Sequence, residues 1–485
     1  MIPPPEPGGL APCLEVALRP REPTSSLLAW VWGTPLRNWL SKQEIDALVR
    51  PIFPDLDVGN EGEDVLKLLR WQRIYLPHMK HLHRLHELLS GPTSPVETVC
   101  FVPEAPPPPA RWNLLPGQRA LAPARASIGL AHPNAPALPD PVQDLSPWAH
   151  HRQLAPAGVG PSKKTGADGG TIALADVEHG WALDGPFLRH PYLQHVRPNL
   201  LGEINHPAGA DHGTRALGVI YAVDRDAPTG EATGLANASG RLLLLANRRR
   251  VAETMEIQTT ADQIGHATER LYPGAILLVE AQTLETKPSG PNSLVPSEYE
   301  GAVYDAVRRA VNKGVIVIAA AGNSHFQNGS TSLDSILLPN GQCPFDRALR
   351  DSGAVLVGAG SWMNNQWGRM NYSNYGTRID CFAAGENVLT TSYGPTDASG
   401  IATACLCDDF NGTSAAAAII AGVARSLQGM ALARCGALLT PTAMRRLLSD
   451  PTLGTPCAAG HQIGVMPDLE RLAAVVARLP PGDFL

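Results

Sequence analysis

From about residue 144 onward, short apolar segments alternate with stretches of helical character. The segments carry apolar side chains at successive positions rather than at alternate ones, and they are residues 171–175, 275–279, 315–320 and 354–357. A strand that is apolar on both sides must be covered on both faces, and such strands separated by helices are typical of parallel sheets. The sequence therefore predicts an α/β domain with a mostly parallel sheet and helices on both faces.

Residues 1–103 are predicted to form a separate, small α+β domain. Strand-like segments occur at 14–18, 73–76 and 96–102, and helical segments at 41–49 and 81–89. The first helical segment begins at Ser41 with Glu44 three positions on, which is the pattern of a capping box. The order strand, helix, strand, helix, strand favours a ferredoxin-like arrangement.

Residues 104–143 are predicted to be a linker between this domain and residues 144–485. The segment holds four consecutive prolines at 106–109 and several more beyond them. Proline-rich chain is extended and semi-rigid, and it has little core of its own.

Charge and hydropathy exclude several classes of partner. The formal net charge of the 485 residues is −6, so neither a nucleic acid nor an anionic membrane surface is expected as a partner. No apolar run reaches the ~18 residues of a membrane-spanning helix. The first residues lack a basic stretch followed by an apolar one, so no Sec-type signal peptide is expected. The compartment stays open between the cytoplasm and export by another route.

The eight cysteines are too few for a disulfide scaffold in a chain of this length. Cys405 and Cys407 lack the two-residue spacing of common zinc and redox motifs. They are either ordinary thiols or partners in a disulfide with Cys381 or Cys343.

Ser414 stands between a Gly-Thr turn and an alanine run at 415–418. The run favours a helix whose first turn carries Ser414, where free backbone N–H groups can bind negative charge. A serine hydroxyl becomes a strong nucleophile only beside a base. Taken alone, Ser414 is therefore better explained as a helix cap than as a nucleophile.

Three more polar residues stand at the ends of predicted elements. Asp176 follows the segment 171–175, His212 precedes an apolar helix, and Asn323 follows the segment 315–320. Each alone fits a structural role. Together with Ser414 they supply the nucleophile, the base, the acid that orients the base, and the amide that binds an oxyanion in acyl transfer.

With these residues in this order, the chain from about 144 to 478 resembles the subtilisin-like serine peptidases, or subtilases. Residues 171–176 are similar to the family's aspartate strand, and three further motifs match: His212-Gly213-Thr214, Ala321-Gly322-Asn323 and Gly412-Thr413-Ser414-x-Ala416. The resemblance implies a serine endopeptidase that forms an acyl-enzyme on Ser414. His212 would be the base, Asp176 would orient it, and Asn323 would bind the oxyanion.

Three departures from the family pattern are visible. Ala418 stands where the family usually has proline, and the acidic motif reads Ala-Asp-Val-Glu over 175–178 rather than Asp-Thr/Ser-Gly. Glu280, Ala281 and Gln282 replace the Ser-Leu-Gly that borders the substrate. An acid at position 280 would make the S1 region acidic and favour basic P1 residues.

The resemblance also implies partners. Peptides or proteins would be the substrates, no cofactor would be required, and no metal site is predicted, although subtilases commonly bind calcium and no acidic loop here identifies a calcium site. Residues 1–103 would be either a propeptide that assists folding and inhibits the site within the same chain, or a retained accessory domain.

Two alternatives to an active subtilase remain. The first is a pseudopeptidase that binds peptides or partner proteins through the cleft and the N-terminal domain. The second is the sedolisin type, in which Glu and Asp replace the histidine, and His212 argues against it. Two further clusters fit solvated surface: the histidines at positions 78, 81, 83 and 86, and the three arginines at 248–250.

Overall fold

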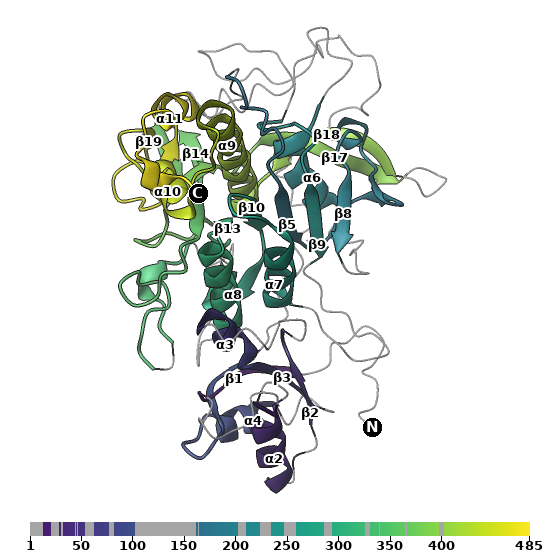
Figure 1. Ribbon diagram of the computed structural model, residues 1–485, viewed down its shortest axis with the longest axis vertical. Helices are drawn as coiled ribbons and strands as arrows, with labels where there is room; N and C mark the ends of the chain where they lie inside the picture. Colours follow the sequence, from purple (N-terminus) through teal and green to yellow (C-terminus); the bar gives the residue numbers. More distant parts are fainter. Residues whose placement is uncertain are drawn as a thin grey trace.

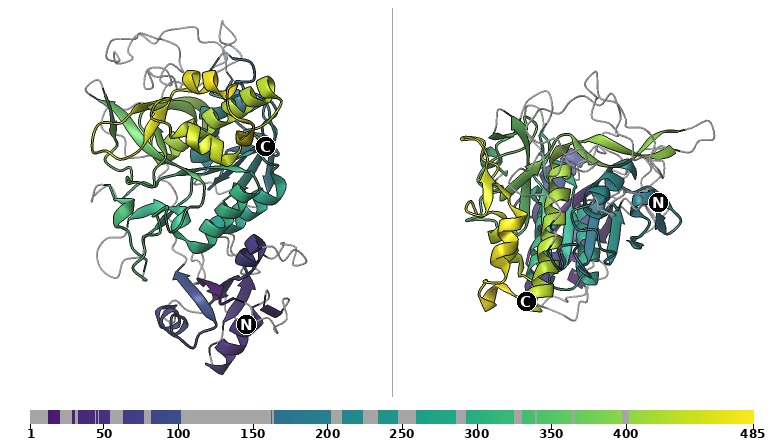
Figure 2. Two further views of the ribbon diagram at one scale, coloured as in Figure 1. Left: turned by 60° about the vertical axis from the view of Figure 1, so that its left-hand side comes forward. Right: turned by 90° about the horizontal axis from the view of Figure 1, so that it is seen from above.

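The structure, a computed structural model, contains an N-terminal α+β domain and a larger α/β domain (Figures 1 and 2). It describes residues 13–20, 29–30, 33–43, 45, 47–53, 63–76, 82–101, 162, 164–201, 210–223, 234–246, 259–285, 293–324, 330–338, 340–363, 366–396 and 402–485. The predicted linker at 104–143, His78, His81 and the arginines at 248–250 lie outside these residues.

The N-terminal domain is a small α+β domain, as predicted, but its antiparallel sheet has four strands where the sequence indicated three. Its elements are β1 (Cys13–Leu18), α2 (Thr34–Lys42), β2 (Leu48–Pro51), α3 (Glu63–Leu69), β3 (Trp71–Tyr75), α4 (Leu82–Leu89) and β4 (Val96–Phe101). The strand order is β2-β3-β1-β4. The helix predicted over 41–49 is wrong, because α2 ends at Lys42 and Val49 pairs with Ile74 in the sheet, where its side chain is buried.

A ten-stranded sheet forms the core of the α/β domain. Along the sheet its strands are β19 (Gly454–Pro456), β20 (Val465–Pro467), β16 (Cys381–Ala384), β14 (Val355–Met363), β13 (Ile316–Ala320), β10 (Ile276–Val279), β5 (Leu174–Glu178), β9 (Leu242–Ala246) and β8 (Pro198–Leu201), and β15 (Gln366–Arg369) pairs with β14. Every pairing from β8 to β20 is parallel, and β5, β9, β10 and β13 are buried at every position. The predicted parallel sheet with both faces covered is confirmed.

Two pairs of helices cover this sheet. The first pair is α6 (Ala210–Tyr221) with α9 (Gly412–Cys435), and the second is α7 (Thr260–Arg270) with α8 (Gly301–Asn312); α10 (Pro441–Leu448) and α11 (Leu469–Val476) follow at the C-terminal end. Among the described helices, α9 alone has the length and hydropathy of a membrane span, and 94% of its most apolar window is buried inside the protein. It is the core helix, and it continues unbroken past the buried Ala418.

Three further strand pairs flank the sheet. Two are short, β6 (Leu183–Asp184) with β7 (Phe187–Leu188) and β11 (Gln282–Leu284) with β12 (Leu294–Pro296), and the third is the long hairpin of β17 (Val388–Thr396) with β18 (Ala402–Phe410). The hairpin extends from the domain beside α6 (Figure 1). All eight cysteines are free thiols, so the alternative of a disulfide at Cys405 or Cys407 is not supported.

The strand order reverses at β5. The chain leaves β5 for β8 and β9 on one side of it and then crosses to β10 on the other side. In parallel sheets, binding crevices form at the carboxyl ends of the strands at such a point. A functional site is therefore expected beyond the ends of β5 and β10.

The N-terminal domain rests on α7 and α8 through a buried cluster of charged side chains (Figure 1). Arg73 donates to Glu15 within its own domain at 2.8 Å, and to Asp262 and Thr259 of the α/β domain at 2.9 Å each. Nearby, Trp71 Nε1 donates to Asp305 on α8 at 2.8 Å. Arg73 is only 4% exposed, so its charge depends on the two carboxylates.

Arg73→Met is expected to destabilise the protein by about 3–5 kcal/mol, because it leaves Glu15 and Asp262 buried without their cation. Chemical denaturation measures the change. The matched control is Arg70→Met, which breaks a more exposed pair with Glu97 and should cost less than about 1 kcal/mol. Equal effects of the two substitutions would show that the domains do not depend on this cluster.

Candidate active site

His212 lies in the first turn of α6, next to the loop that follows β5. The close approach requires glycine at the next position: a Cβ on Gly213 would lie 2.3 Å from the carbonyl oxygen of Gly180 and 2.7 Å from the Trp181 ring. The His212 side chain is 9% exposed, so its ring is nearly enclosed and its partners are protein groups.

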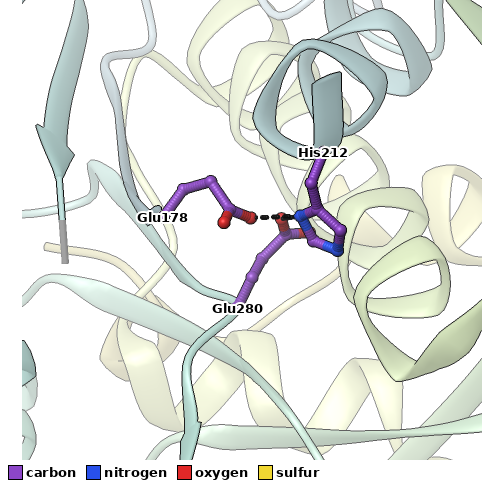
Figure 3. A group of neighbouring side chains, drawn as sticks. All are labelled: Glu178, His212 and Glu280. Carbon is purple, nitrogen blue, oxygen red and sulfur yellow. Dashed lines mark hydrogen bonds and ion pairs between the residues drawn. The ribbon is translucent and has the colours of Figure 1, made fainter. Parts of the chain in front are cut away.

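Glu178, at the end of β5, is the acid that contacts His212 (Figure 3). Its Oε2 lies 2.5 Å from His212 Nδ1, and its Oε1 accepts from the backbone N–H of His179. Burial by itself raises the pKa of Glu178, but attraction to His212 and the hydrogen bonds it accepts bring the pKa down to about 2. A carboxylate only accepts hydrogen bonds, so Nδ1 carries the proton and the other ring nitrogen is left as the base.

Asp176 does not occupy the position predicted for it. The strand runs to Glu178 rather than ending at residue 175, so Asp176 lies inside β5, where its carboxylate accepts from Trp181 Nε1 at 2.8 Å. Burial and the charge of Glu178 raise its pKa, against the lowering effect of the Trp181 hydrogen bond. The sequence did hold a signal for Glu178, because Gly180 follows it at the spacing of the family's Asp-Thr/Ser-Gly motif.

The three residues predicted to border the substrate have different surroundings. The Glu280 side chain is 0% exposed and its Oε2 lies 3.7 Å from His212 Nδ1, so the structure does not support its predicted role as an acid facing the S1 region. Ala281 is buried. Gln282 accepts a hydrogen bond from the backbone N–H of Asn323 at 2.9 Å and so positions that residue, a role that no sequence motif indicated.

Ser414 lies in the first turn of α9 and is 6% exposed. The turn before it requires glycine, since Gly412 has a φ of +100°. The backbone N–H of Gly412 donates to the hydroxyl of Tyr372 at 3.0 Å and to the Gly385 carbonyl at 2.9 Å, and the Tyr372 hydroxyl donates to that same carbonyl. Tyr372 therefore anchors the turn that precedes Ser414, a role that no sequence motif indicated.

Asn323 lies beyond the end of β13, against the residue that precedes Ser414. Its Oδ1 accepts from the Thr413 backbone N–H at 2.8 Å and from the Thr413 hydroxyl at 3.0 Å. These two donors fix the orientation of the amide, because Oδ1 must face Thr413. The Nδ2 group is then the end of the side chain that remains to donate a hydrogen bond to a substrate.

The β17–β18 hairpin contacts α6, which carries His212, and leads into α9, which carries Ser414. Arg215 on α6 pairs with Asp211 and with Asp409 of β18, each at 2.7 Å. Phe410, the last residue of β18, packs edge-on against the His212 ring with the ring centroids 5.5 Å apart. Since α6 also packs against α9, the positions of His212 and Ser414 are set by the same group of contacts.

Glu178, His212 and Glu280 each offer a ligand atom, and these atoms lie within 4.8 Å of one another. A divalent metal held at ~2.0–2.2 Å from each ligand would keep the ligand atoms ~3 Å or more apart. The 2.5 Å between Glu178 Oε2 and His212 Nδ1 is instead the length of a direct, charge-assisted hydrogen bond. The arrangement fits a histidine oriented by a carboxylate.

Comparison with known proteins gives a consistent picture. The family model described as "Subtilase family" matches residues 201–460, more than half of the chain, a range that includes His212, Asn323 and Ser414 and begins after Glu178. The chain is 29% identical over 161 residues to an alkaline proteinase of Hapsidospora chrysogena (33% of this chain, 34% of the relative). It is also 29% identical over 289 residues to subtilisin BL of Lederbergia lenta (57% of this chain, 82% of the relative).

The chain thus spans about a third of the length of the Hapsidospora relative. Among solved structures, fervidolysin from Fervidobacterium pennivorans aligns with a TM-score of 0.54 at 16% identity, over 98% of this chain and 62% of that one. At this identity the similarity concerns the fold alone.

Asp176→Asn is expected to stabilise the protein at pH 8 by on the order of 1 kcal/mol and to have little effect at pH 4. Burial and the charge of Glu178 raise the pKa of folded Asp176, so its contribution to stability is complete below the unfolded pKa of ~3.9 and is lost as the pH rises through the folded pKa. Denaturation in a Ser414→Ala background measures this without self-cleavage. Exposed Asp184→Asn is the control; a stability change for Asp176→Asn that is the same at both pH values would contradict a buried neutral acid.

Proposed function

We propose that this chain, which belongs to the subtilase family, is a serine endopeptidase that cleaves peptide bonds through an acyl-enzyme on Ser414. The observation that carries the proposal is a pair of contacts. Glu178 holds His212, and Asn323 holds Thr413, the residue before Ser414. Acyl transfer needs these two elements, a base that is oriented by an acid and an oxyanion donor that is fixed in place.

In this mechanism His212 takes the proton of the Ser414 hydroxyl on Nε2 and later returns it to the leaving amine. Figure 3 supports this assignment, since both glutamates lie on the Nδ1 side of the ring and the other nitrogen points away from them. Glu178 has the role that the family resemblance gave to Asp176. It keeps the proton on Nδ1 and stabilises the imidazolium that forms during the attack.

The negative charge that develops on the substrate carbonyl would be bound by Asn323 Nδ2 and by the backbone N–H of Ser414. The Asn323 amide is preorganised, because Thr413 and Gln282 hold its oxygen and its backbone. The Ser414 N–H belongs to the first turn of α9, whose free N–H groups and dipole favour an anion. Both donors are fixed before the reaction begins, so they need no reorganisation when the charge appears.

The N-terminal domain offers a means of control within the same chain. It is anchored to α7 and α8 by Arg73 and Trp71, at a distance in sequence of more than 180 residues from its partners. This docked arrangement is compatible with both an inhibitory propeptide and a retained accessory domain. Peptides and proteins are the substrates that either arrangement would regulate.

Labelling with a fluorophosphonate probe tests the activity. The intact chain should label at one site, Ser414, and Ser414→Ala should abolish labelling, because the probe reacts only with a serine activated by a neighbouring base. Mass spectrometry of the labelled peptide identifies the site. A folded protein that does not label, and that still binds peptides, would instead be the pseudopeptidase.

Glu178→Gln is expected to lower kcat by about 10³–10⁴-fold with a small change in KM, because an amide no longer fixes the proton on Nδ1. Asp176→Asn serves as the matched control two residues away on the same strand, and its kcat should stay within about threefold of the parent. Steady-state assays on a peptide substrate measure both. A larger loss in the Asp176 variant would return the role of the orienting acid to that residue.

A further inference from the structure

Glu280 and Glu178 occupy equivalent positions just beyond the last paired residues of two neighbouring strands. In the parallel pairing of β5 with β10, Val177 lies beside Val279, so the next residues on the two strands are Glu178 and Glu280. The backbone N–H of Glu280 donates to the Val177 carbonyl, which continues this register past the end of β10. Equivalent positions on adjacent strands point to the same face, so both carboxyl groups meet under His212 (Figure 3).

The surroundings of Glu280 favour its protonated, neutral form over the ionised carboxylate. Its side chain is 0% exposed, and among the described residues no group donates a hydrogen bond to either of its oxygens. The basic side chain beside it is His212, whose Nδ1 lies 3.7 Å away and already donates to Glu178. An ionised Glu280 would therefore be a buried charge without a donor, at a cost of several kcal/mol.

We propose that Glu280 is a positioning residue of the catalytic site: it holds a proton at neutral pH and donates a hydrogen bond from its carboxyl O–H to Glu178. The two glutamates then form an acid pair behind His212, with one proton and one negative charge between them. The positioning role rests on the proposed peptidase function, whereas the protonation of Glu280 does not.

The charges around Glu280 agree with this arrangement. Three titratable groups lie near it: Asp176 and Glu178 on β5 and His212 on α6. Burial raises the pKa of Glu280, and the negative charge of Glu178 and the hydrogen bond between the two carboxyl groups raise it further. The same hydrogen bond helps to keep Glu178 ionised, so the two groups take opposite protonation states.

The pair matters most when His212 becomes charged. The imidazolium forms beside Glu178, which must present one oxygen to Nδ1 throughout the reaction. A donor from Glu280 restricts the rotation of the Glu178 carboxylate without adding a second negative charge near the ring. If Glu280 lost its proton, two carboxylates in contact would repel each other and Glu178 would be displaced from Nδ1.

The first test measures stability against pH in Ser414→Ala protein, where activity plays no part. Folded Glu280 keeps its proton, so its contribution to stability is complete below the unfolded pKa of ~4.3 and falls as the pH rises. The equilibrium constant for folding of Glu280→Gln, divided by that of the parent, should therefore rise about tenfold or more between pH 5 and pH 9. Glu97→Gln, at a half-exposed position, is the control for pH effects unrelated to burial. A ratio that does not change with pH would overturn the proposal.

The second test compares kcat in Glu280→Gln and Glu280→Leu. Glutamine keeps a neutral donor toward Glu178, so it should retain kcat within about threefold at pH 7, whereas leucine, with no donor, should lose about tenfold or more. KM should be unchanged in both, since Glu280 does not reach the surface. Equal kcat in the two variants would overturn the positioning role. If the parent does not label with the fluorophosphonate, the peptidase function fails while the stability test still decides whether Glu280 is protonated.

Discussion

The in-register parallel pairing of β5 with β10 is the constraint on which the rest of the site depends. It brings the ends of two strands to the same level, so that Glu178 and Glu280 meet beneath the first turn of α6. The order of the strands reverses at β5, which leaves room beyond its carboxyl end. The missing side chain of Gly213 lets the helix with His212 approach that end. The position of His212 therefore depends on the register and strand order of the sheet.

The burial of three neighbouring carboxyl groups then affects which of them carries charge. Asp176, Glu178 and Glu280 are all buried, and they have few donors among them. Glu178 accepts hydrogen bonds from the His212 ring and the His179 backbone N–H, whereas Asp176 accepts one from Trp181 alone among the described residues. Several like charges cannot share a low-dielectric site without a cation each, so the pKa of the group with the best donors is lowered and the pKa values of the other two are raised. The hydrogen-bond donors around each carboxyl group, rather than the choice of Asp or Glu, therefore decide which acid can orient His212.

Sequence alone predicted the parallel sheet, the small α+β domain and three of the four residues proposed for catalysis. These predictions rest on local patterns: apolar runs, and short motifs around His212, Asn323 and Ser414. The acid that contacts His212 is Glu178 rather than Asp176, because β5 ends at Glu178, three residues beyond the strand end predicted at position 175. Positions 176 and 178 share a face, so periodicity could not separate them. The helix expected at 41–49 failed for a related reason, since its last residues, Leu48 and Val49, pair with a strand more than 20 positions away.

Glutamate at the end of β5 also explains why a second acid is needed there. Compared with aspartate, glutamate has one more rotatable bond, and fixing a long side chain costs up to ~2 kcal/mol of conformational entropy. An orienting acid must present one oxygen to Nδ1 while the ring gains and loses charge, so this freedom has to be removed. The His179 backbone N–H restrains one oxygen of Glu178 and His212 binds the other. A neutral carboxylic acid at position 280 adds a third restraint at the same face of the sheet and brings no extra charge. Glu178 and the protonated Glu280 therefore act together in orienting His212, and the register of β5 with β10 places the two side chains beside each other.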